Sequence, residues 1–389
     1  MPSKILVVDD EPDLELLIRQ KFRKRIRRGD LEFVFAGDGV EALEHLRGDE
    51  EIDIVLTDIN MPRMDGLTLL DKIGGLERLV KVVIVSAYGD MENIRTAMNR
   101  GAFDFLTKPI DFVDLETTVD KTRDELEALK QSVALQRQLT ALQQELDIAA
   151  RIQLSTLPST FPAFPDRSDF DLHATMRPAR EVGGDFYDFF LVDADRLGFV
   201  LGDVSGKGVG AALFMAVTRT ILRATALQGL PAQACVRHVN RVLYPESLPH
   251  MFVTLVYGIL HTLTGEVFYC NAGHTLPYVI RRGAGVTPLA GTGGVGLCLL
   301  KDFDYRAGSL TLQPGDTLLL YSDGVTDAVN DRRDQFTDER LRHRLLRMNG
   351  SAPAELVRDV LHALDTFSGG VAQPDDVTML ALQYHGPPA

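Results

Sequence analysis

The chain is poor in cysteine. It has three in 389 residues, Cys235, Cys270 and Cys298, which lie far apart and form no Cys-x-x-Cys pair or zinc-ligand spacing. It also lacks an uninterrupted apolar run near the ~18 residues that a membrane-spanning helix needs. Its first ten residues are a short apolar strand ended by acids, not a signal peptide. We therefore expect a cytoplasmic protein with reduced, buried cysteines and no membrane contact.

Basic residues are outnumbered, 41 against 55 acidic ones, which gives a formal charge of −14. This balance argues against broad binding to nucleic acid or anionic membranes. One segment departs from it, because seven of the ten residues in Arg19–Arg28 are basic. A nucleic-acid patch is one interpretation. The other interpretation is a solvated helix face with cations near the helix C-terminus. The net negative charge of the chain favours this second interpretation.

The length predicts two or three domains, and composition shifts place them. In residues 1–121 short apolar runs alternate with stretches of helical period; the runs are Ile5–Val8, Ile52–Leu56, Val80–Val85 and Phe103–Leu106. Continuous apolar runs between helices are typical of a parallel sheet covered on both faces. The pattern predicts a doubly wound, flavodoxin-like α/β domain whose sites lie at the carboxyl ends of the strands.

Residues 114–157 contain neither glycine nor proline. Apolar residues recur there at three- and four-residue steps, and the steps from Leu135 onward are four, three, four, three. This seam predicts a long helix or coiled coil, with a stammer near residues 129–135. A single helix packed on its own domain is the alternative. A dimeric coil is favoured, because so long a polar helix needs a partner for its apolar stripe.

Prolines after Leu157 end this helix. The sequence pattern is different over residues 158–386. Strand-like runs dominate; they are Leu197–Gly202, Phe252–Leu260, Val267–Asn271, Leu276–Ile280, Thr317–Tyr321 and Val377–Gln383. Pairs of helical stretches lie among them, at 209–227 and 231–242 and at 338–348 and 352–367. This order predicts an α+β domain in which one sheet packs on another and helices lie outside.

Polar residues end four successive strands of the first domain. They are Asp9 and Asp10, Asp58, Ser86 and Lys108. In a parallel sheet these side chains meet at one edge. Three carboxylates there suit Mg²⁺ with retained waters, and a carboxylate beside Mg²⁺ can accept a phosphoryl group. One such aspartate alone would be a helix cap or turn residue.

Together these residues resemble the receiver domain of two-component response regulators. The resemblance implies that Asp58 is the phosphoacceptor and that Asp9 and Asp10 are the acidic pair. It implies Mg²⁺ ligands from Asp10, Asp58 and the Asn60 carbonyl. It also implies a switch hydroxyl, an aromatic switch residue and a phosphate-binding lysine, which are Ser86, Phe105 and Lys108.

Four acidic motifs mark the second domain. They are Gly183-Gly-Asp-Phe-Tyr-Asp188, Gly202-Asp-Val-Ser-Gly-Lys-Gly208, Ser322-Asp-Gly-Val-Thr-Asp327 and Pro374-Asp-Asp-Val-Thr378. A lone Gly-Asp or Asp-Gly pair would be a hairpin turn. Carboxylates from several strand ends can instead gather around two hard cations, bind phosphate and activate water. The chain has no P-loop motif, which argues against a P-loop NTPase.

The four motifs resemble the metal-dependent serine/threonine phosphatases of the PPM family, in the bacterial branch typified by SpoIIE and RsbU. The match includes the lead-in Ala150–Pro158 and the segment Asn271–His274. The resemblance implies catalytic metal ligands at Asp203, Asp323 and Asp375, the Val204 carbonyl at the shared metal, and Asp185 as an accessory acid. It leaves open whether Asp375 or Asp376 ligates, with Asp375 preferred. His274 is a weak candidate that a structural histidine explains equally well.

The resulting hypothesis is a response regulator whose output is a protein phosphatase. A sensor histidine kinase would phosphorylate Asp58, with Mg²⁺ in the receiver and two Mn²⁺ or Mg²⁺ ions in the phosphatase. The substrate would be a phosphorylated anti-anti-sigma protein of the STAS type, and the linker helix would form a homodimer. A non-catalytic adaptor that uses the phosphatase fold to bind a sigma-regulatory partner is the alternative. A DNA-binding regulator fits the charge poorly.

Overall fold

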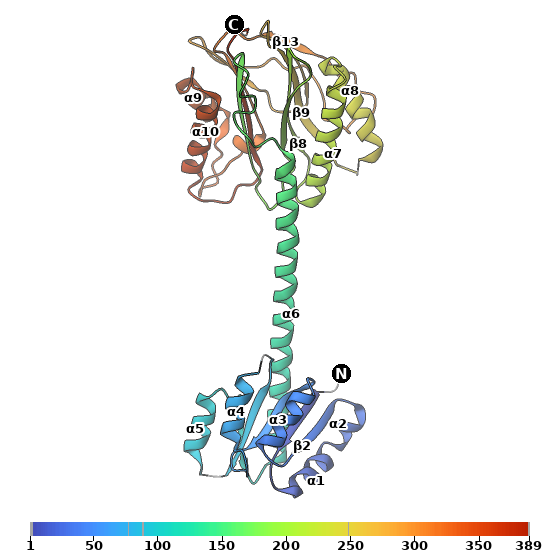
Figure 1. Cartoon of the computed structure of the whole chain (residues 1–389), viewed down its shortest axis with the longest axis vertical. Helices are drawn as coiled ribbons and strands as arrows, with labels where there is room; N and C mark the ends of the chain where they lie inside the picture. The colour runs from blue at the N-terminus through green and yellow to red at the C-terminus, as the bar shows by residue number, and fades with distance from the viewer. Residues whose placement is uncertain (1–2, 77, 88, 248, 388–389) are drawn as a thin grey trace. The chain divides into compact units, whose positions relative to one another are not determined.

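The computed structural model describes residues 3–387 apart from 77, 88 and 248 (Figure 1). The first two residues of the predicted domain 1–121 therefore lie outside the described part. The chain divides into two compact units, residues 1–141 and 142–389. The division falls inside one helix, α6 (Phe112–Thr156), which is continuous over 45 residues.

The first unit is built on a five-stranded parallel sheet with the order β2-β1-β3-β4-β5. The strands are β1 (Ser3–Val8), β2 (Leu31–Ala36), β3 (Ile52–Asp58), β4 (Lys81–Ala87) and β5 (Asp104–Lys108). The predicted doubly wound fold is confirmed. β2 is not among the predicted apolar runs, because the exposed Glu32 interrupts its buried residues.

Helices cover both faces of this sheet. They are α1 (Pro12–Lys21), α2 (Arg23–Arg28), α3 (Gly39–Gly48), α4 (Gly66–Gly74), α5 (Met91–Asn99) and the first part of α6. One core joins α3, α4 and α5 to one face of the strands. The other joins α1 and α6 to the opposite face, through residues such as Ile18, Leu115 and Val119. The sheet whose strand ends carry the predicted site residues is therefore buried on both faces.

Helix α6 begins two residues before the predicted start at Asp114 and runs through residues 129–135 without a break. Leu126 is the last side chain of α6 that is buried in the first unit. Beyond it Leu135, Leu139 and Leu142 are 58%, 53% and 55% exposed. The long helix is thus confirmed, and its apolar stripe is uncovered in the single chain. The predicted dimeric coil remains a prediction.

The second unit is a sandwich of two five-stranded sheets. Their orders are β13-β10-β9-β8-β7 and β12-β11-β14-β15-β6. The strands are β6 (Phe170–Arg177), β7 (Phe186–Leu191), β8 (Arg196–Val204), β9 (Val253–His261), β10 (Glu266–Ala272), β11 (Tyr278–Arg281), β12 (Gly285–Pro288), β13 (Gly308–Thr311), β14 (Thr317–Tyr321) and β15 (Val377–Tyr384).

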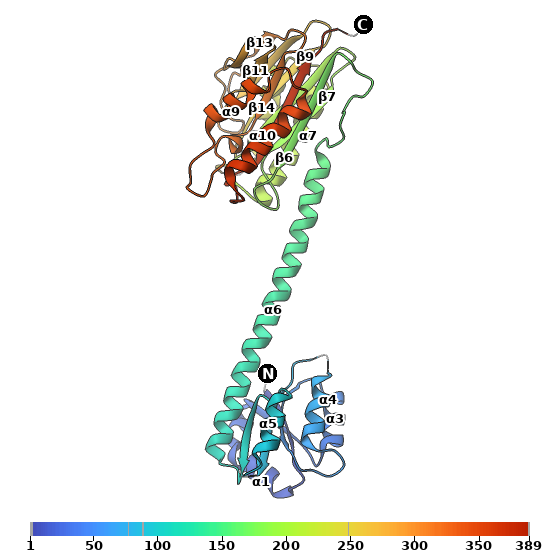
Figure 2. The same ribbon diagram turned by 90° about the vertical axis from the view of Figure 1, so that its left-hand side faces the viewer.

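Helices lie outside this sandwich on both sides (Figure 2). They are α7 (Val209–Ala226), α8 (Ala232–Leu243), α9 (Thr337–Arg347) and α10 (Pro353–Ser368), with short 3-10 turns η1 (Tyr244–Glu246) and η2 (Asp323–Val325). One core lies between the sheets and under α7 and α8, and the other lies under α9 and α10. The predicted sheet-on-sheet α+β fold with outer helices is confirmed.

Helix α7 is long and apolar enough to cross a membrane by length and composition alone. Its apolar sequence is interrupted by Arg219 and Arg223. Core helices of globular domains can have the same length and composition. In the structure Ala211, Met215 and Leu222 of α7 are buried in the sandwich core.

Candidate functional site

Three carboxylates meet at the carboxyl end of the receiver-like sheet. Asp9 and Asp10 follow β1, and Asp58 ends the adjacent parallel strand β3. One ligand oxygen from each lies within 4.8 Å of the others. Among residues that the structure describes, this is the group that meets that criterion. Hard oxygen donors at such spacing fit a Mg²⁺ ion.

Lys108 neutralises part of this cluster from the end of β5. Its Nζ lies 2.7 Å from Asp58 Oδ2, 2.9 Å from Asp9 Oδ2 and 3.0 Å from Glu11 Oε1. Burial alone would lower the pKa of Lys108, but hydrogen bonds to these carboxylates, Asp58 first, raise it. Burial raises the pKa of Asp9, although Lys108 opposes that shift. The lysine is therefore a fixed cation beside the predicted phosphoacceptor.

The other predicted receiver residues, Asn60, Ser86 and Phe105, have different environments. The Asn60 backbone N–H donates to Asp58 Oδ1 at 3.4 Å. Ser86 is fully buried, with its hydroxyl 3.5 Å from Asp90 Oδ2, and Phe105 is 37% exposed. Gly66 follows the chain reversal after β3, where a Cβ atom would lie 2.1 Å from the Asp58 carbonyl oxygen. This close approach requires glycine, a requirement that is visible only in the folded chain.

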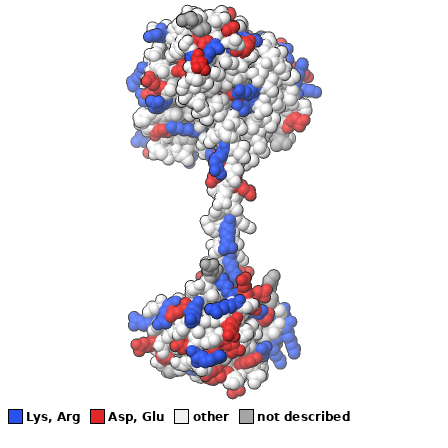
Figure 3. All heavy atoms as spheres, in the orientation of Figure 1, with Lys and Arg blue, Asp and Glu red and all other residues white. Residues whose placement is uncertain are grey.

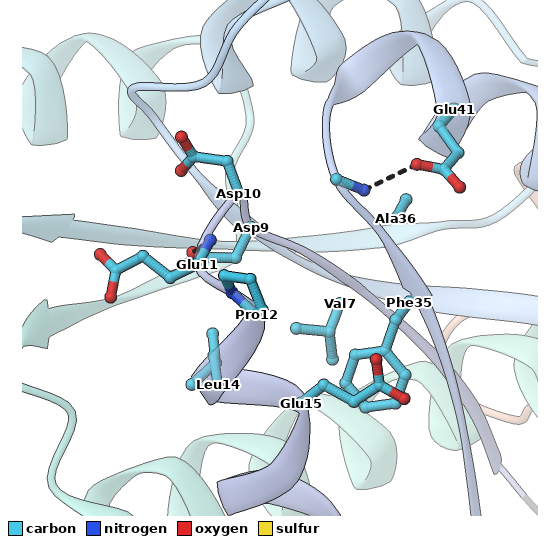
Figure 4. A pocket seen from close by; sticks show the side chains of 11 residues that line it. Val7, Asp9, Asp10, Glu11, Pro12, Leu14, Glu15, Phe35, Ala36 and Glu41 are labelled. Atoms are coloured by element: carbon cyan, nitrogen blue, oxygen red, sulfur yellow. Dashed lines mark hydrogen bonds between the residues drawn. The ribbon is translucent and has the colours of Figure 1, made fainter.

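A pocket of about 270 Å³ opens beside the acidic pair (Figure 4). Asp9, Asp10 and Glu11 line it from the loop between β1 and α1, and Glu41 lines it from α3. Glu41 Oε2 accepts the Gly37 backbone N–H at 2.8 Å, as the dashed line marks. Asp58 is not among the lining residues. The pocket thus lies next to the predicted phosphorylation site and is strongly acidic.

In the second unit each sheet of the sandwich brings acids to one end. Asp185 precedes β7 and Asp203 lies on β8, so both belong to the first sheet. Asp323 follows β14, and Asp375 precedes β15, in the other sheet. Charge–charge coupling links Asp203 to both Asp323 and Asp375, and Asp185 to Asp203. The predicted metal carboxylates therefore lie at the same end of both sheets, although within the described residues no three of them share the 4.8 Å spacing of Asp9, Asp10 and Asp58.

These carboxylates disfavour one another's ionisation. Burial, then the charges of Asp323 and Asp375, raise the pKa of Asp203 to about 7. Burial and the charge of Asp203 raise the pKa of Asp185 well above its usual range, and burial with the charge of Asp375 raises that of Asp323. Asp185 Oδ2 is buried without a hydrogen-bond partner. Like charges crowded in this way are the arrangement that a divalent cation relieves.

The neighbours Asp375 and Asp376 differ in their surroundings. Asp376 is 7% exposed, and both its oxygens accept backbone N–H groups, Oδ1 from Ala179 at 2.8 Å and Oδ2 from Gly184 at 2.7 Å. Asp375 is more exposed, and its Oδ2 lies 2.9 Å from Lys207 Nζ. Asp376 is therefore occupied in holding the backbone, whereas Asp375 is more accessible and pairs with a cation. This geometry favours the preferred assignment, which stays a prediction.

Lys207 was not predicted as a site residue. It lies in the glycine-rich turn after Asp203, and its Nζ donates to Asp375 Oδ2 and to the Pro374 carbonyl oxygen. The only signal for Lys207 in the sequence is a cation inside a motif that is otherwise acidic and glycine-rich.

The predicted Val204 ligand lies beside Gly184, whose carbonyl accepts the Val204 N–H at 3.3 Å.

His274 is buried and bonds to structural groups. Its Nδ1 lies 2.8 Å from Thr254 Oγ1, and its backbone N–H donates to Asn271 Oδ1 at 2.8 Å. Thr254 is the register partner of Asp203 across β8 and β9. Burial lowers the pKa of His274 to about 4. The contacts support the structural interpretation of this weak candidate.

The basic segment 19–28 divides into α1 and α2 at Phe22, and part of its charge is paired. Arg19 binds Glu15, Lys21 binds Glu116 and Arg25 binds Asp120. Figure 3 shows acidic and basic side chains mixed on the visible face of each unit. Both observations favour the solvated helix face over a nucleic-acid patch.

Family models match both units. The response regulator receiver domain matches residues 5–120, and stage II sporulation protein E (SpoIIE) matches residues 193–385. Protein IcfG of Synechocystis is 33% identical over 265 residues, which cover 61% of this chain and 41% of that protein. The phosphoserine phosphatase RsbU of Bacillus subtilis is 27% identical over 186 residues, 48% of this chain and 54% of RsbU. The chain thus spans about half the length, or less, of these relatives.

Solved structures agree with the fold of the second unit. The RsbU and RsbW domains of a Mycobacterium tuberculosis protein match with a TM-score of 0.50 and 30% identity, over 57% of this chain and 61% of that one. The SiaA-PP2C domain of Pseudomonas aeruginosa matches with a TM-score of 0.56 and 22% identity, over 63% and 98%. The chain therefore carries an N-terminal receiver domain of the response regulator family, followed by a SpoIIE-type domain of the PPM serine/threonine phosphatase family.

Proposed function

We propose that this protein is a response regulator whose second domain hydrolyses phosphoserine or phosphothreonine on a partner protein. The observation that carries the proposal is the set of acids from both sheets of the sandwich. Asp185, Asp203 and Asp323 have raised pKa values, and Asp375 lies among them. Burying unpaired charge is costly, so a protein that does not catalyse a reaction would gain no stability from placing buried carboxylates close together.

The donor set fits two hard divalent cations. Asp203, Asp323, Asp375 and the Val204 carbonyl would hold them, with Asp185 as the accessory acid, and the orphaned buried oxygen of Asp185 supports this fit. Bound Mn²⁺ or Mg²⁺ would supply an acidified water and neutralise phosphate oxygens. Lys207, at the exposed side of the cluster, is placed to attract the substrate phosphate.

In the receiver we propose Asp58 as the phosphoacceptor. Asp9, Asp10, Asp58 and the Asn60 carbonyl would hold Mg²⁺, and Lys108 would balance the charge of the added phosphoryl group. A sensor histidine kinase would donate that group to the Asp58 carboxylate. Ser86 and Phe105 would then respond as the switch hydroxyl and the aromatic switch residue.

The relatives suggest the partner. RsbU is named a phosphoserine phosphatase, and we propose the same substrate class here, borne on an anti-anti-sigma protein of the STAS type. The exposed stripe of α6 supports a homodimer through the linker helix. The domain limits 1–121, 114–157 and 158–386 are part of this proposal.

A non-catalytic adaptor is the second candidate, favoured by the salt bridge that Lys207 already makes with Asp375. A cation of the protein itself at the site would relieve part of the repulsion without a metal. The two candidates differ in one measurable property, which is hydrolysis that depends on the metal carboxylates.

Hydrolysis of a generic phosphate ester by the full chain, with and without Mn²⁺, tests the proposal. We expect turnover that needs Mn²⁺ and is abolished by a chelator. Asp203→Asn should lower kcat by at least ~10²-fold at saturating Mn²⁺, because it removes a shared ligand. The exposed Asp331→Asn is the matched control. Near-wild-type turnover of Asp203→Asn would favour the adaptor.

A further inference from the structure

The last turn of α6 is bonded to the loop that presents Asp185. Gln153 is 6% exposed, and its amide makes two hydrogen bonds with one residue, Gly183. Its Nε2 donates to the Gly183 carbonyl oxygen at 2.5 Å, and its Oε1 accepts the Gly183 N–H at 3.1 Å. The neighbouring Ile152 and Leu154 are 62% and 42% exposed. Gln153 therefore faces inward for this contact.

A second bond lies on the other side of Asp185. The hydroxyl of Tyr187 donates to the Pro158 carbonyl oxygen at 2.8 Å. Leu157, directly after the helix ends, is buried in the sandwich core. The end of α6 and the residues after it thus hold the chain at positions 183 and 187, two residues before and two residues after Asp185.

The loop has little freedom apart from these bonds. Asp376 Oδ2 accepts the N–H groups of Gly184 at 2.7 Å and Asp185 at 3.3 Å. A Cβ atom on Gly183 would lie 2.3 Å from that same oxygen. A shift of Gly183 therefore disturbs Asp376 and the backbone of Asp185 together, since the space is filled and the polar groups are paired.

We propose that Gln153 is a positioning residue that fixes Asp185 in the metal site and passes the state of α6 to it. The inference rests on the proposed function and names the element that regulates the same site. Helix α6 has no glycine or proline from residue 112 to 156, so a rotation or displacement of the helix reaches Gln153. Loss of the amide pair leaves two buried backbone groups of Gly183 unsatisfied and releases the loop.

The substitution Gln153→Met in the full chain tests this proposal. Methionine keeps the length and burial of the side chain but makes neither hydrogen bond with Gly183. Gln144→Met, at an exposed position of the same helix, is the matched control. Three readouts apply. They are hydrogen–deuterium exchange of the 183–185 amides, the Mn²⁺ concentration for half-maximal ester hydrolysis, and the activity ratio with and without a small phosphodonor acting on Asp58.

We expect Gln153→Met to speed the exchange and to raise the half-saturating Mn²⁺ concentration, each by about tenfold, the size that two lost hydrogen bonds imply. It should also abolish the phosphodonor response, while Gln144→Met matches wild type. A merely structural role would reduce the amount of active protein without moving the half-saturating Mn²⁺. Wild-type values in all three readouts would overturn the proposal.

Two further comparisons keep the result decisive. If thermal unfolding shows that Gln153→Met does not fold, Gln153→Glu decides, because it keeps the acceptor for the Gly183 N–H and loses the donor. A reduced phosphodonor response supports the inference, and an unchanged one overturns it. Absence of hydrolysis in the wild type at any Mn²⁺ would instead sink the proposed function, and the exchange readout would still test the Gln153 contact.

Discussion

Adjacent aspartates in one motif have different roles at the residue scale. Asp376 accepts three backbone N–H groups, from Ala179, Gly184 and Asp185, whereas Asp375 pairs with Lys207. Motif position alone leaves the two undecided, because both carboxylates precede the same strand. The hydrogen-bond partners separate a residue that holds the backbone from one that pairs with a cation.

Substitution should separate them experimentally. Asp376→Asn places an amide NH₂ where an oxygen accepts backbone N–H groups, so the free energy of unfolding should fall by about 1–3 kcal/mol. Asp375→Asn should leave stability within about 0.5 kcal/mol and remove most ester hydrolysis. Urea unfolding and Mn²⁺-dependent turnover measure the two effects. The reverse pattern would move the ligand assignment to Asp376.

His274 gives a pH-dependent stability with a defined sign. Burial lowers its pKa from an ordinary 6.5 to about 4. Between these values the unfolded chain takes up a proton that the folded chain does not, so this contribution is intact above pH 6.5 and lost as pH falls toward 4. The full loss is about 3 kcal/mol.

Urea unfolding of wild type and His274→Gln at pH 7 and pH 4.5 measures this contribution. The difference between the two pH values should be smaller in the variant, and His362→Gln, at an exposed site, should behave as wild type. Equal pH dependence in all three proteins would show that His274 is protonated in the folded chain.

The placement of a candidate site residue could be predicted from the sequence where that residue ends a strand. Asp9, Asp10 and Asp58 could be brought together because parallel strands end at one edge, and the structure places them there. Lys207 and Gln153 could not be found in this way. Their contacts join segments more than 25 residues apart through side-chain geometry that no local pattern encodes.

At the element scale the same contrast holds for strands. Strands with continuous apolar runs, such as β3 and β15, were predicted within a few residues. β6 and β7 were not, because polar residues such as His173 and Asp188 interrupt them. Asp188 is fully buried and paired with Arg219 and Arg223 of α7. A buried ion pair makes a core strand look amphipathic in the sequence.

The uncovered stripe of α6 predicts self-association. Leu139 is 53% exposed in the single chain, and burial of such half-exposed side chains between two helices would stabilise a coil by roughly 1 kcal/mol each. Leu139→Lys should therefore shift the chain from dimer to monomer without lowering the melting temperature of either domain. Sedimentation equilibrium measures the mass.

The control for this change is Gln144→Lys, which adds the same charge away from the stripe. It should leave the mass unchanged. A wild-type chain that stays monomeric up to high micromolar concentration would remove the dimer from the proposal, and α6 would then act within one chain.

At the scale of the whole molecule, one uninterrupted helix belongs to both units. Leu126 of α6 is buried in the receiver core, and Leu157, just after the helix ends, is buried in the sandwich core. Phosphorylation of Asp58 would add negative charge beside Lys108, four residues before α6 begins. Under the proposed function, the helix would be the covalent route by which a change at the receiver edge reaches the phosphatase acids.

A flexible insertion tests this route. Gly-Ser-Gly after the exposed Ser132 should break the helix, because a glycine-rich segment behaves as a flexible coil. We expect each domain to keep its own melting transition and the basal ester hydrolysis to persist. The change in hydrolysis on addition of a small phosphodonor, with activation the expected sign, should disappear. An insertion of Ala-Glu-Ala at the same place preserves helicity and alters only the phase of the helix, so it should change the size of the response rather than remove it. If the glycine variant still responded fully to phosphorylation of Asp58, transmission through α6 would be wrong, and direct contact between receiver and phosphatase would replace it.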